Sequence, residues 1–256
     1  MSHMYFVFDL DGTICFKGQP VTEPILQSLE QLTASGHEVV FASARPIRDL
    51  LPVLDKRFHG YKMVGGNGSL ICQNGNIKQV AEFSSMILVQ LKAILEKYRA
   101  TYLIDGDWDY AYTGPADHSI LNNLNPHNLA EKKPLERLNS IVKVLILTSY
   151  NMDALYEELK PLDIIIHLHK GEGILDISPT GIHKWSALKQ LCIPQGSYIA
   201  FGNDTNDISM FKHAHHAVMI GHHDMLAPYS DETISNDFNV EQQIIEKIAE
   251  FNVRYA

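Results

Sequence analysis

The stretch Tyr5-Phe-Val-Phe-Asp9-Leu-Asp11-Gly-Thr13-Ile carries the main signal for the fold of this chain. Its first four residues are apolar and β-prone, and they predict a buried strand. Asp9 and Asp11 follow at the carboxyl end, where the two-residue period of a strand points both carboxylates the same way. Two like charges at this spacing are costly unless a cation lies between them or one acid holds a proton. The stretch therefore favours a carboxylate-based site over a solvated turn.

This string resembles the first motif of the haloacid dehalogenase superfamily of phosphotransferases. In that family the first Asp attacks phosphorus and becomes an aspartyl phosphate, while the second protonates the leaving oxygen and then activates water. Carried over by position, the resemblance implies that Asp9 is the nucleophile and Asp11 the general acid and base. The residue types suit these roles, because a carboxylate can form a covalent phospho-intermediate and a neighbouring carboxyl can transfer the proton.

The composition sets broad limits. A chain of 256 residues, 45% of them hydrophobic, can bury a substantial core and suits one large domain or two smaller ones. The net charge of −9 argues against a general binder of nucleic acids or anionic membranes. The apolar run at 140–148 is broken by Lys143 and is too short to span a membrane. The chain starts directly into the first strand, so we expect no signal peptide.

Cysteine usage narrows the chemistry. Cys15, Cys72 and Cys192 are far apart and odd in number, which predicts reduced thiols in a cytoplasmic protein. None is followed by Arg six residues later, so a thiolate phosphatase loop is excluded. The sequence also lacks the Gly-x-x-x-x-Gly-Lys-Ser/Thr pattern of P-loop nucleotide hydrolases. If the protein acts on phosphate groups, these two absences favour a mechanism that uses carboxylates and a metal ion.

The order of the elements predicts an α/β fold. Strands are predicted at 5–8, 38–42, 198–201 and 217–220, helices at 20–36, 183–191, 206–212 and 240–250, a short helix near Pro46 and a hairpin around 69–76. This alternation predicts a Rossmann-like, doubly wound parallel-sheet core built from residues 1–78 and 179–256. The middle differs, with helices at 86–98 and 152–160 and strands at 101–104, 142–148, 164–169 and 174–177. We therefore expect an inserted α+β domain at 79–178.

A second motif follows the second predicted strand. Ser43-Ala44-Arg45-Pro46 resembles the family's Ser or Thr at a strand end, often followed by Gly-Arg-Pro, with Ala44 in place of the Gly. The resemblance implies that Ser43 hydrogen-bonds a phosphoryl oxygen. It also implies that Arg45 contacts an anion or anchors the loop. We place Ser43, Ala44 and Arg45 in the phosphate site.

A third motif lies at 178–188, which reads Ser-Pro-Thr-Gly-Ile-His-Lys-Trp-Ser-Ala-Leu and resembles the Pro-x-Gly-Val-x-Lys-Gly-x-Ala-Leu of the Cof-type subgroup. The resemblance implies that Lys184 neutralises charge on the attacking carboxylate and the phosphoryl group. Asn67-Gly68 resembles the Asn-Gly that these proteins carry before their cap, which implies that Asn67 lies near the phosphate. Because Cof-type members insert an α/β cap between the second and third motifs, we expect the 79–178 unit to be that cap and to select the substrate.

The fourth motif contains the one departure from the family pattern. Gly202-Asn203-Asp204-Thr205-Asn206-Asp207 resembles the subgroup's Gly-Asp-x-x-Asn-Asp, a loop that holds Mg²⁺ through hard oxygen ligands. Asn203 stands where the subgroup has Asp. Either its amide oxygen binds the metal, or Asp204 substitutes after a small shift of the loop. The predicted metal ligands are Asp9, Asp11, Asn203, Asp204 and Asp207, and Asn206 joins Asn67 and Lys184 among the phosphate-binding residues.

Histidines crowd the end of the core segment, at His213, His215, His216, His222 and His223. Their spacing matches no pair of metal ligands on a helix, so a zinc site is not favoured. His167 and His169 alternate along one predicted strand, and we expect them to line or flank the cap sheet.

These patterns together predict a cytoplasmic, Mg²⁺-dependent phosphatase that acts on a small phosphorylated metabolite, such as a sugar phosphate, a nucleotide or a cofactor phosphate. We expect a monomer or weak homodimer that binds neither nucleic acid nor membrane. Two alternatives stay open. A phosphomutase shares the aspartyl phosphate, and a non-catalytic sensor of phosphorylated metabolites is made conceivable by Asn203.

Overall fold

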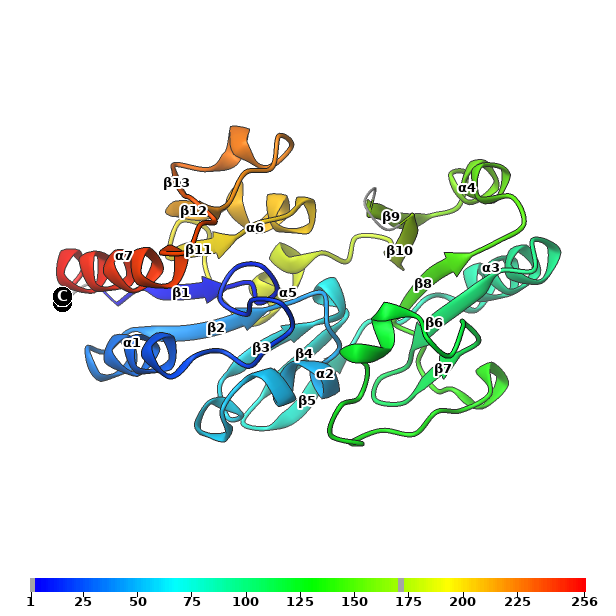
Figure 1. Ribbon diagram of the computed structural model, residues 1–256, viewed down its shortest axis with the longest axis horizontal. Coiled ribbons are helices and arrows are strands. Elements are labelled where there is room, and N and C mark those ends of the chain that lie inside the picture. Colours follow the sequence, from blue (N-terminus) through cyan, green and yellow to red (C-terminus); the bar gives the residue numbers. More distant parts are fainter. Residues whose placement is uncertain (1–2, 170–172) are drawn as a thin grey trace.

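The computed structural model describes residues 3–169 and 173–256, and it contains two β-sheets that lie side by side along the longest axis of the molecule (Figure 1). The first sheet has eight strands in the order β13-β12-β11-β1-β2-β3-β4-β5. Its strands are β1 (Tyr5–Phe8), β2 (Glu38–Ala42), β3 (Lys62–Gly65), β4 (Leu70–Gln73), β5 (Asn76–Val80), β11 (Tyr198–Gly202), β12 (His216–Ile220) and β13 (Glu232–Ile234). Neighbours from β13 to β3 are parallel, and only the β3-β4-β5 edge is antiparallel.

The position of β1 explains where a site forms. The chain leaves β1 toward β2 and β3 on one side, and β11, β12 and β13 extend the sheet on the other. In open α/β sheets such a reversal of strand order leaves a crevice at the carboxyl ends of the central strands. Asp9, Ser43 and Asn203 directly follow β1, β2 and β11, so all three lie at this edge.

Alternating side chains of the first sheet feed two hydrophobic clusters. Phe6 and Phe8 point into one cluster and Val7 into the other, as the two-residue period requires. The helices are α1 (Glu23–Ala34) and α7 (Val240–Arg254) against the first cluster, α5 (Lys184–Gln190) and α6 (Ile208–Phe211) against the second, and the short α2 (Ile47–Leu50) beside the first. Burying each large apolar side chain contributes about 1.5–3 kcal/mol. The sheet edge is thus held by packing on both faces.

The second sheet is antiparallel, in the order β7-β6-β8-β10-β9. Its strands are β6 (Thr101–Asp105), β7 (Tyr110–Tyr112), β8 (Lys143–Thr148), β9 (Ile164–His169) and β10 (Ile174–Pro179). Helices α3 (Ser85–Lys97) and α4 (Met152–Leu159) cover one face over their own hydrophobic cluster. The opposite face carries a smaller cluster that includes residues of the 3₁₀ segment Ser119–Asn122.

The predicted α/β fold, with a parallel core and a second α+β unit, is confirmed. The boundaries at 78/79 and 178/179 stay a prediction: the first sheet continues to Val80, and β10 of the second sheet ends at Pro179. The three-residue strands β7 and β13 escaped sequence analysis because so short a segment shows no periodicity. Within the described ranges, none of the helices combines the length and the apolar character that a membrane crossing needs.

Candidate active site

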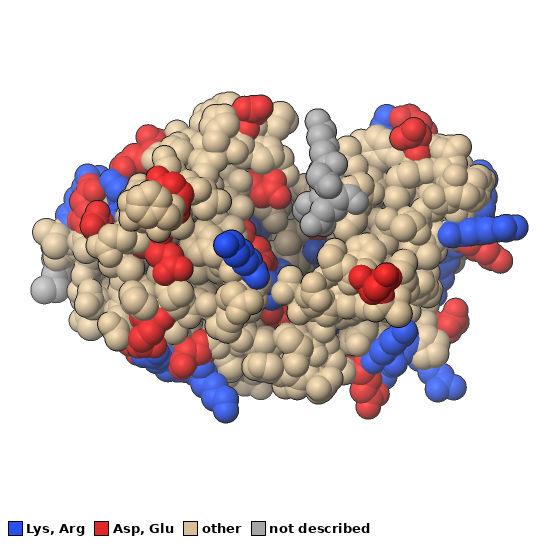
Figure 2. Space-filling view, in the orientation of Figure 1, with Lys and Arg blue, Asp and Glu red and all other residues tan. Residues whose placement is uncertain are grey.

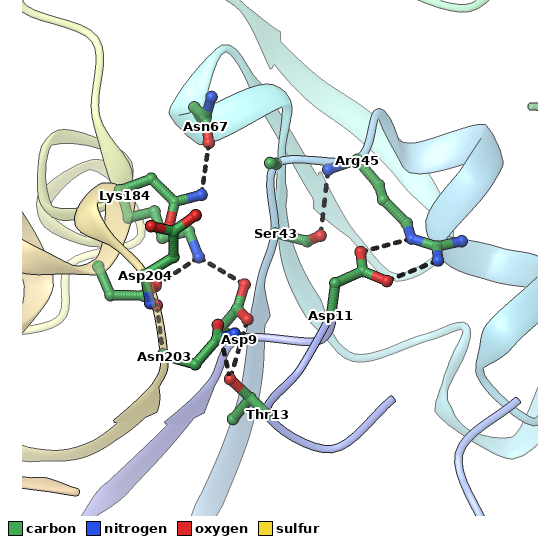
Figure 3. Close-up of polar contacts among 12 residues, drawn as sticks. Asp9, Asp11, Thr13, Ser43, Arg45, Asn67, Lys184, Asn203 and Asp204 are labelled. Atoms are coloured by element: carbon green, nitrogen blue, oxygen red, sulfur yellow. Dashed lines mark hydrogen bonds and ion pairs between the residues drawn. The ribbon is translucent and has the colours of Figure 1, made fainter. Parts of the chain in front are cut away.

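Lys184 links two of the predicted motifs. Its Nζ lies 2.6 Å from Asp9 Oδ1 and 2.6 Å from Asp207 Oδ1, and the side chain is fully buried at the start of α5 (Figure 3). Burial disfavours the ammonium, but the carboxylates of Asp207 and Asp9 outweigh it and raise the pKa of Lys184. A fixed positive charge therefore lies against the proposed nucleophile.

Asp9, the predicted nucleophile, lies in surroundings that oppose its ionisation. Burial raises its pKa from 3.8 to about 7; Lys184 opposes this shift, whereas the nearby Asp207 and Asp11 add to it. Its other oxygen, Oδ2, accepts a hydrogen bond of 3.0 Å from Thr13 Oγ1. Both carboxylate oxygens thus have partners that favour ionisation, although the surroundings oppose it.

Asp11 points away from Asp9 and toward the second motif (Figure 3). Arg45 donates two hydrogen bonds to it, from Nε at 2.7 Å and from Nη2 at 2.6 Å. Ser43 is buried, and its Oγ accepts a hydrogen bond of 3.1 Å from the Arg45 backbone N–H. A guanidinium forms the same kind of bidentate pair with a phosphoryl group as with a carboxylate. Arg45 can therefore exchange its contact with Asp11 for one with a phosphoryl group.

The loop after β11 is folded around Asp207. Asp207 Oδ2 accepts hydrogen bonds from the backbone N–H groups of Asn203 at 2.8 Å and Asp204 at 3.1 Å. A Cβ at position 202 would lie 2.5 Å from that same oxygen, so the glycine there permits the close approach. Asp207 therefore shapes the loop with one oxygen and holds Lys184 with the other.

Asn203 and Asp204 point in different directions (Figure 3). Asn203 Oδ1 lies 3.3 Å from Thr13 Oγ1, the hydroxyl that also contacts Asp9. Its amide packs on Gly12, where an added Cβ would lie 2.2 Å from Nδ2. Asp204 instead accepts from the Thr205 N–H at 2.6 Å. Of the two candidates, Asn203 is the one whose side chain lies beside Asp9.

The oxygen donors suit a hard cation. Asp9 Oδ2 and Asn203 Oδ1 converge on the hydroxyl of Thr13, and oxygen is the ligand atom that Mg²⁺ prefers. Among residues 3–169 and 173–256, no group of three or more His, Cys, Asp or Glu side chains is placed to hold a metal ion. An amide oxygen and a backbone carbonyl fall outside that residue set, and Asp11 is paired with Arg45. A metal site here would rest on few side-chain charges.

A chain of polar contacts joins this edge to the second sheet. Asn206 Nδ2 donates to Asn67 Oδ1 at 3.1 Å, and Asn67 Nδ2 donates to Asp176 Oδ2 at 3.1 Å. Lys143 Nζ lies 3.0 Å from the same Asp176 oxygen and donates to the Ala44 carbonyl at 2.8 Å. The predicted phosphate residues Ala44, Asn67 and Asn206 are thereby brought into one network.

Sequence analysis missed the contributions of the second sheet. In the sequence Lys143 only breaks an apolar run, and Asp176 belongs to no motif. Asp105 is expected to start an acidic turn at 105–107, whereas it is the last residue of β6. All three are buried, in strands whose residues are mostly apolar. A lone charge inside an apolar strand was the available signal, because it is costly unless it has a partner.

A cavity of about 340 Å³ opens between the two sheets. Asp9, Asp11 and Asn203 line it from the first sheet, and Lys143 and Asp176 line it from the second. Charged side chains are visible at this junction in the space-filling view (Figure 2). The volume lies at the low end for small-molecule sites.

The clustered histidines have separate partners. His213 stacks on Trp185 with ring centroids 4.5 Å apart, and His216 Nε2 lies 2.8 Å from Glu232. His222 pairs with Asp224, whereas His223 Nε2 lies 3.4 Å from Asp204. His167 and His169 belong to β9 of the second sheet, as expected.

Fold and site together define a phosphoryl-transfer enzyme of the α/β class, and comparison with known proteins identifies the family. The model of the haloacid dehalogenase-like hydrolases matches residues 6–237. The chain is 22% identical over 228 residues to a 5-amino-6-(5-phospho-D-ribitylamino)uracil phosphatase of Bacillus subtilis, covering 83% of this chain and 84% of that protein. It is 24% identical over 239 residues to the HMP-PP phosphatase of Yersinia enterocolitica, covering 84% and 82%.

Solved structures share the fold over nearly the whole length. A haloacid dehalogenase-like hydrolase from Bacteroides thetaiotaomicron has a TM-score of 0.78 at 19% identity and covers 98% of this chain and 100% of its own. A sugar phosphatase of subclass IIB has a TM-score of 0.77 at 16% identity, with 98% and 99% covered. The chain belongs to the haloacid dehalogenase-like hydrolase family, and the prediction of a phosphatase is confirmed.

Proposed function

We propose that this protein is a Mg²⁺-dependent phosphatase that hydrolyses a small phosphorylated metabolite through an aspartyl phosphate on Asp9. The observation that carries the proposal is the buried contact of Lys184 with both Asp9 and Asp207. A buried ammonium beside an acid of raised pKa keeps that acid available as a carboxylate and stabilises charge on the phosphoryl group.

In the first step, an Asp9 oxygen attacks phosphorus as the bond from phosphorus to the leaving oxygen breaks. Asp11 gives its proton to that oxygen. In the second step, water attacks the phosphorus of the aspartyl phosphate, Asp11 takes the proton of the water, and inorganic phosphate leaves as the Asp9 carboxylate is restored. Arg45 would bind the phosphoryl group and so release Asp11 from the pair that it forms in the structure.

The remaining predicted residues take supporting roles. Ser43 and Lys184 would hydrogen-bond phosphoryl oxygens, with Asn67 and Asn206 holding the adjoining loop. Phosphatases of this superfamily generally use a divalent metal. Mg²⁺ would be held by Asp9, the backbone carbonyl of Asp11 and Asn203, with Asp207 shaping the loop, and when bound it would neutralise phosphate charge.

The second sheet would act as the cap that selects the substrate and excludes water. Its residues line the same cavity as Asp9, which supports the assignment of 79–178 to this role. The named relatives act on phosphorylated small molecules, which supports a small metabolite as substrate here. Free cysteines at Cys15, Cys72 and Cys192 support a reducing, cytoplasmic location. We keep a monomer or weak homodimer as the expected state.

Hydrolysis of acetyl phosphate tests the proposal, because this substrate needs no recognition of a leaving group. We expect turnover that requires Mg²⁺ and that falls by at least about 1,000-fold in Asp9→Asn, since the nucleophile is lost. Asp163→Asn, an exposed acid in the second unit, serves as the matched control and should retain activity. Near-native turnover by Asp9→Asn would overturn the mechanism, and dependence on a bisphosphorylated sugar would favour a phosphomutase.

A further inference from the structure

An apolar wall faces the catalytic residues across the cavity. Leu103 and Leu145 are paired across β6 and β8, so their side chains lie on the same face of the second sheet. Ile174 belongs to the same hydrophobic cluster, and Ile120 and Leu124 pack against it. The apolar wall, made of Leu103, Ile120, Leu124, Leu145 and Ile174, lines the cavity that contains Asp9.

The charged groups beside this wall are engaged in contacts between the two sheets. Asp105 pairs with Arg48 of α2, a residue of the first sheet's half. Lys143 pairs with Asp176 and donates to the Ala44 carbonyl, and Asp176 also accepts from Asn67. These charged groups thus join the halves of the molecule, and apart from Asn123 this side of the cavity offers a substrate mainly apolar surface.

We propose that the alcohol released by this enzyme carries a compact apolar body, such as an aromatic ring, that packs on the apolar wall. The inference rests on the proposed function and adds the class of leaving group. A sugar would bring several hydroxyl groups against leucine and isoleucine side chains, where their bonds to water are lost without replacement. The cavity of about 340 Å³ must also hold the phosphoryl group, so the apolar body is limited to a small ring system.

The test compares 2-phenylethyl phosphate with glucose 6-phosphate in the presence of Mg²⁺. Both are esters of primary alcohols, so their leaving groups need similar protonation in the chemical step. A difference in turnover therefore reports contact with the wall. We expect kcat/KM to be at least about tenfold higher for 2-phenylethyl phosphate, a factor of the size that one apolar group supplies in an apolar pocket. Equal or better turnover of glucose 6-phosphate would overturn the inference.

Two substitutions place the effect on the wall. Leu145→Asn and Leu124→Asn keep side-chain size while adding polarity at half-buried positions, and each should lower kcat/KM for 2-phenylethyl phosphate by about tenfold. Leu168→Asn is the matched control and should change kcat/KM for neither substrate. Leu168 is exposed and faces Leu175, which belongs to the cluster beneath α3 and α4 on the opposite face.

Acetyl phosphate tests the phosphatase function separately from the apolar wall, because its acetyl group is too small to make much contact with the wall. Its turnover should fall by much less than that of 2-phenylethyl phosphate in Leu145→Asn and Leu124→Asn, and the turnover that remains also shows that these variants fold. Absence of turnover by the unmodified protein would defeat the proposed function itself. Normal turnover of acetyl phosphate together with equal losses in Leu168→Asn and the wall variants would defeat only the apolar wall.

Discussion

Asp9 combines two requirements that oppose each other. The proposed reaction needs a carboxylate that is shielded from water, and burial raises the pKa of the Asp9 carboxyl to about 7. Lys184 and Thr13 offset part of this cost through direct contacts. Such residues often reduce the stability of the folded protein while they serve activity.

This conflict predicts a pH-dependent stability difference in the metal-free protein. The pKa of Asp9 is higher in the folded state than its ordinary 3.8, so the folded protein holds this proton more tightly and its free energy of unfolding falls as pH rises from about 4 to 7. Asp9→Asn removes that loss. The melting temperature of the variant should therefore exceed that of the unmodified protein, and by more at pH 8 than at pH 5.

Calorimetry in the presence of a chelator measures the difference in melting temperature. Each kcal/mol of unfolding free energy should shift the melting temperature by about 2–4 °C. Asp163→Asn, whose position is exposed, provides the baseline for removing a negative charge anywhere on the molecule. A gain that is the same at both pH values would show that the pKa of Asp9 is not raised by its surroundings.

The loop between β11 and α6 shows how local sequence sets an element of the site. Gly202 lets Asp207 fold back on the backbone of Asn203 and Asp204, and this turn directs one side chain toward Asp9 and the other toward His223. Motif spacing predicted the loop, because the hydrogen bonds that fold its backbone join residues four or fewer positions apart. Which of the two side chains points to Asp9 depends on the fold of the loop, so the sequence left both open.

The geometry makes position 203 the place where an added negative charge should raise Mg²⁺ affinity. Asn203→Asp places a further carboxylate beside Asp9 and should tighten Mg²⁺ binding about tenfold or more, since affinity for hard cations rises with ligand charge. Asp204→Asn is the matched control, with the same two residue types exchanged one position later, and it should leave affinity nearly unchanged. Titration calorimetry with MgCl₂ reports both, and loss of binding in Asp204→Asn would assign the ligand to Asp204 instead.

A second buried cation, besides Lys143, joins the two halves of the molecule. Arg48 is fully buried and pairs with Asp49 and with Asp105 of β6, and its Nη1 donates to the Trp108 carbonyl at 2.9 Å. These partners come from both halves of the molecule. The sequence could not reveal them, because a residue at 48 meets one at 105 only after both sheets have formed.

Arg48→Met should therefore destabilise the protein by about 3–5 kcal/mol, since it leaves the buried carboxylates of Asp49 and Asp105 without a counter-charge. Denaturant unfolding measures the loss. Arg57→Met is the matched control, because Arg57 also contacts several acids but does so in water, and its loss should have a small effect. Equal effects of the two substitutions would contradict the role of Arg48 as the link between the sheets.

The sequence allowed the edge of the first sheet to be predicted, but not the contribution of the second sheet, and the reason is physical. The four motifs each follow a core strand or start a helix, and parallel strands bring such ends together at one edge. Asp9, Ser43, Lys184 and Asn203 lie together at one edge of the first sheet, and their roles stay a prediction. Asp105, Lys143 and Asp176 belong to an antiparallel sheet whose register and approach to the core follow from packing, which a single sequence does not encode in local patterns.

The buried pair of Asp9 and Lys184 has a consequence for synthesis of the chain. These residues are 175 positions apart. At about 5–20 residues per second, roughly 10–35 seconds pass between the translation of one and the other. The strands of the second sheet, from Thr101 to Pro179, are contiguous in sequence. They can pair on the ribosome while β1 still lacks its neighbour β11. The second sheet should thus form before the first is complete, and the edge of β1 that faces β11 stays open to aggregation until β11 is made.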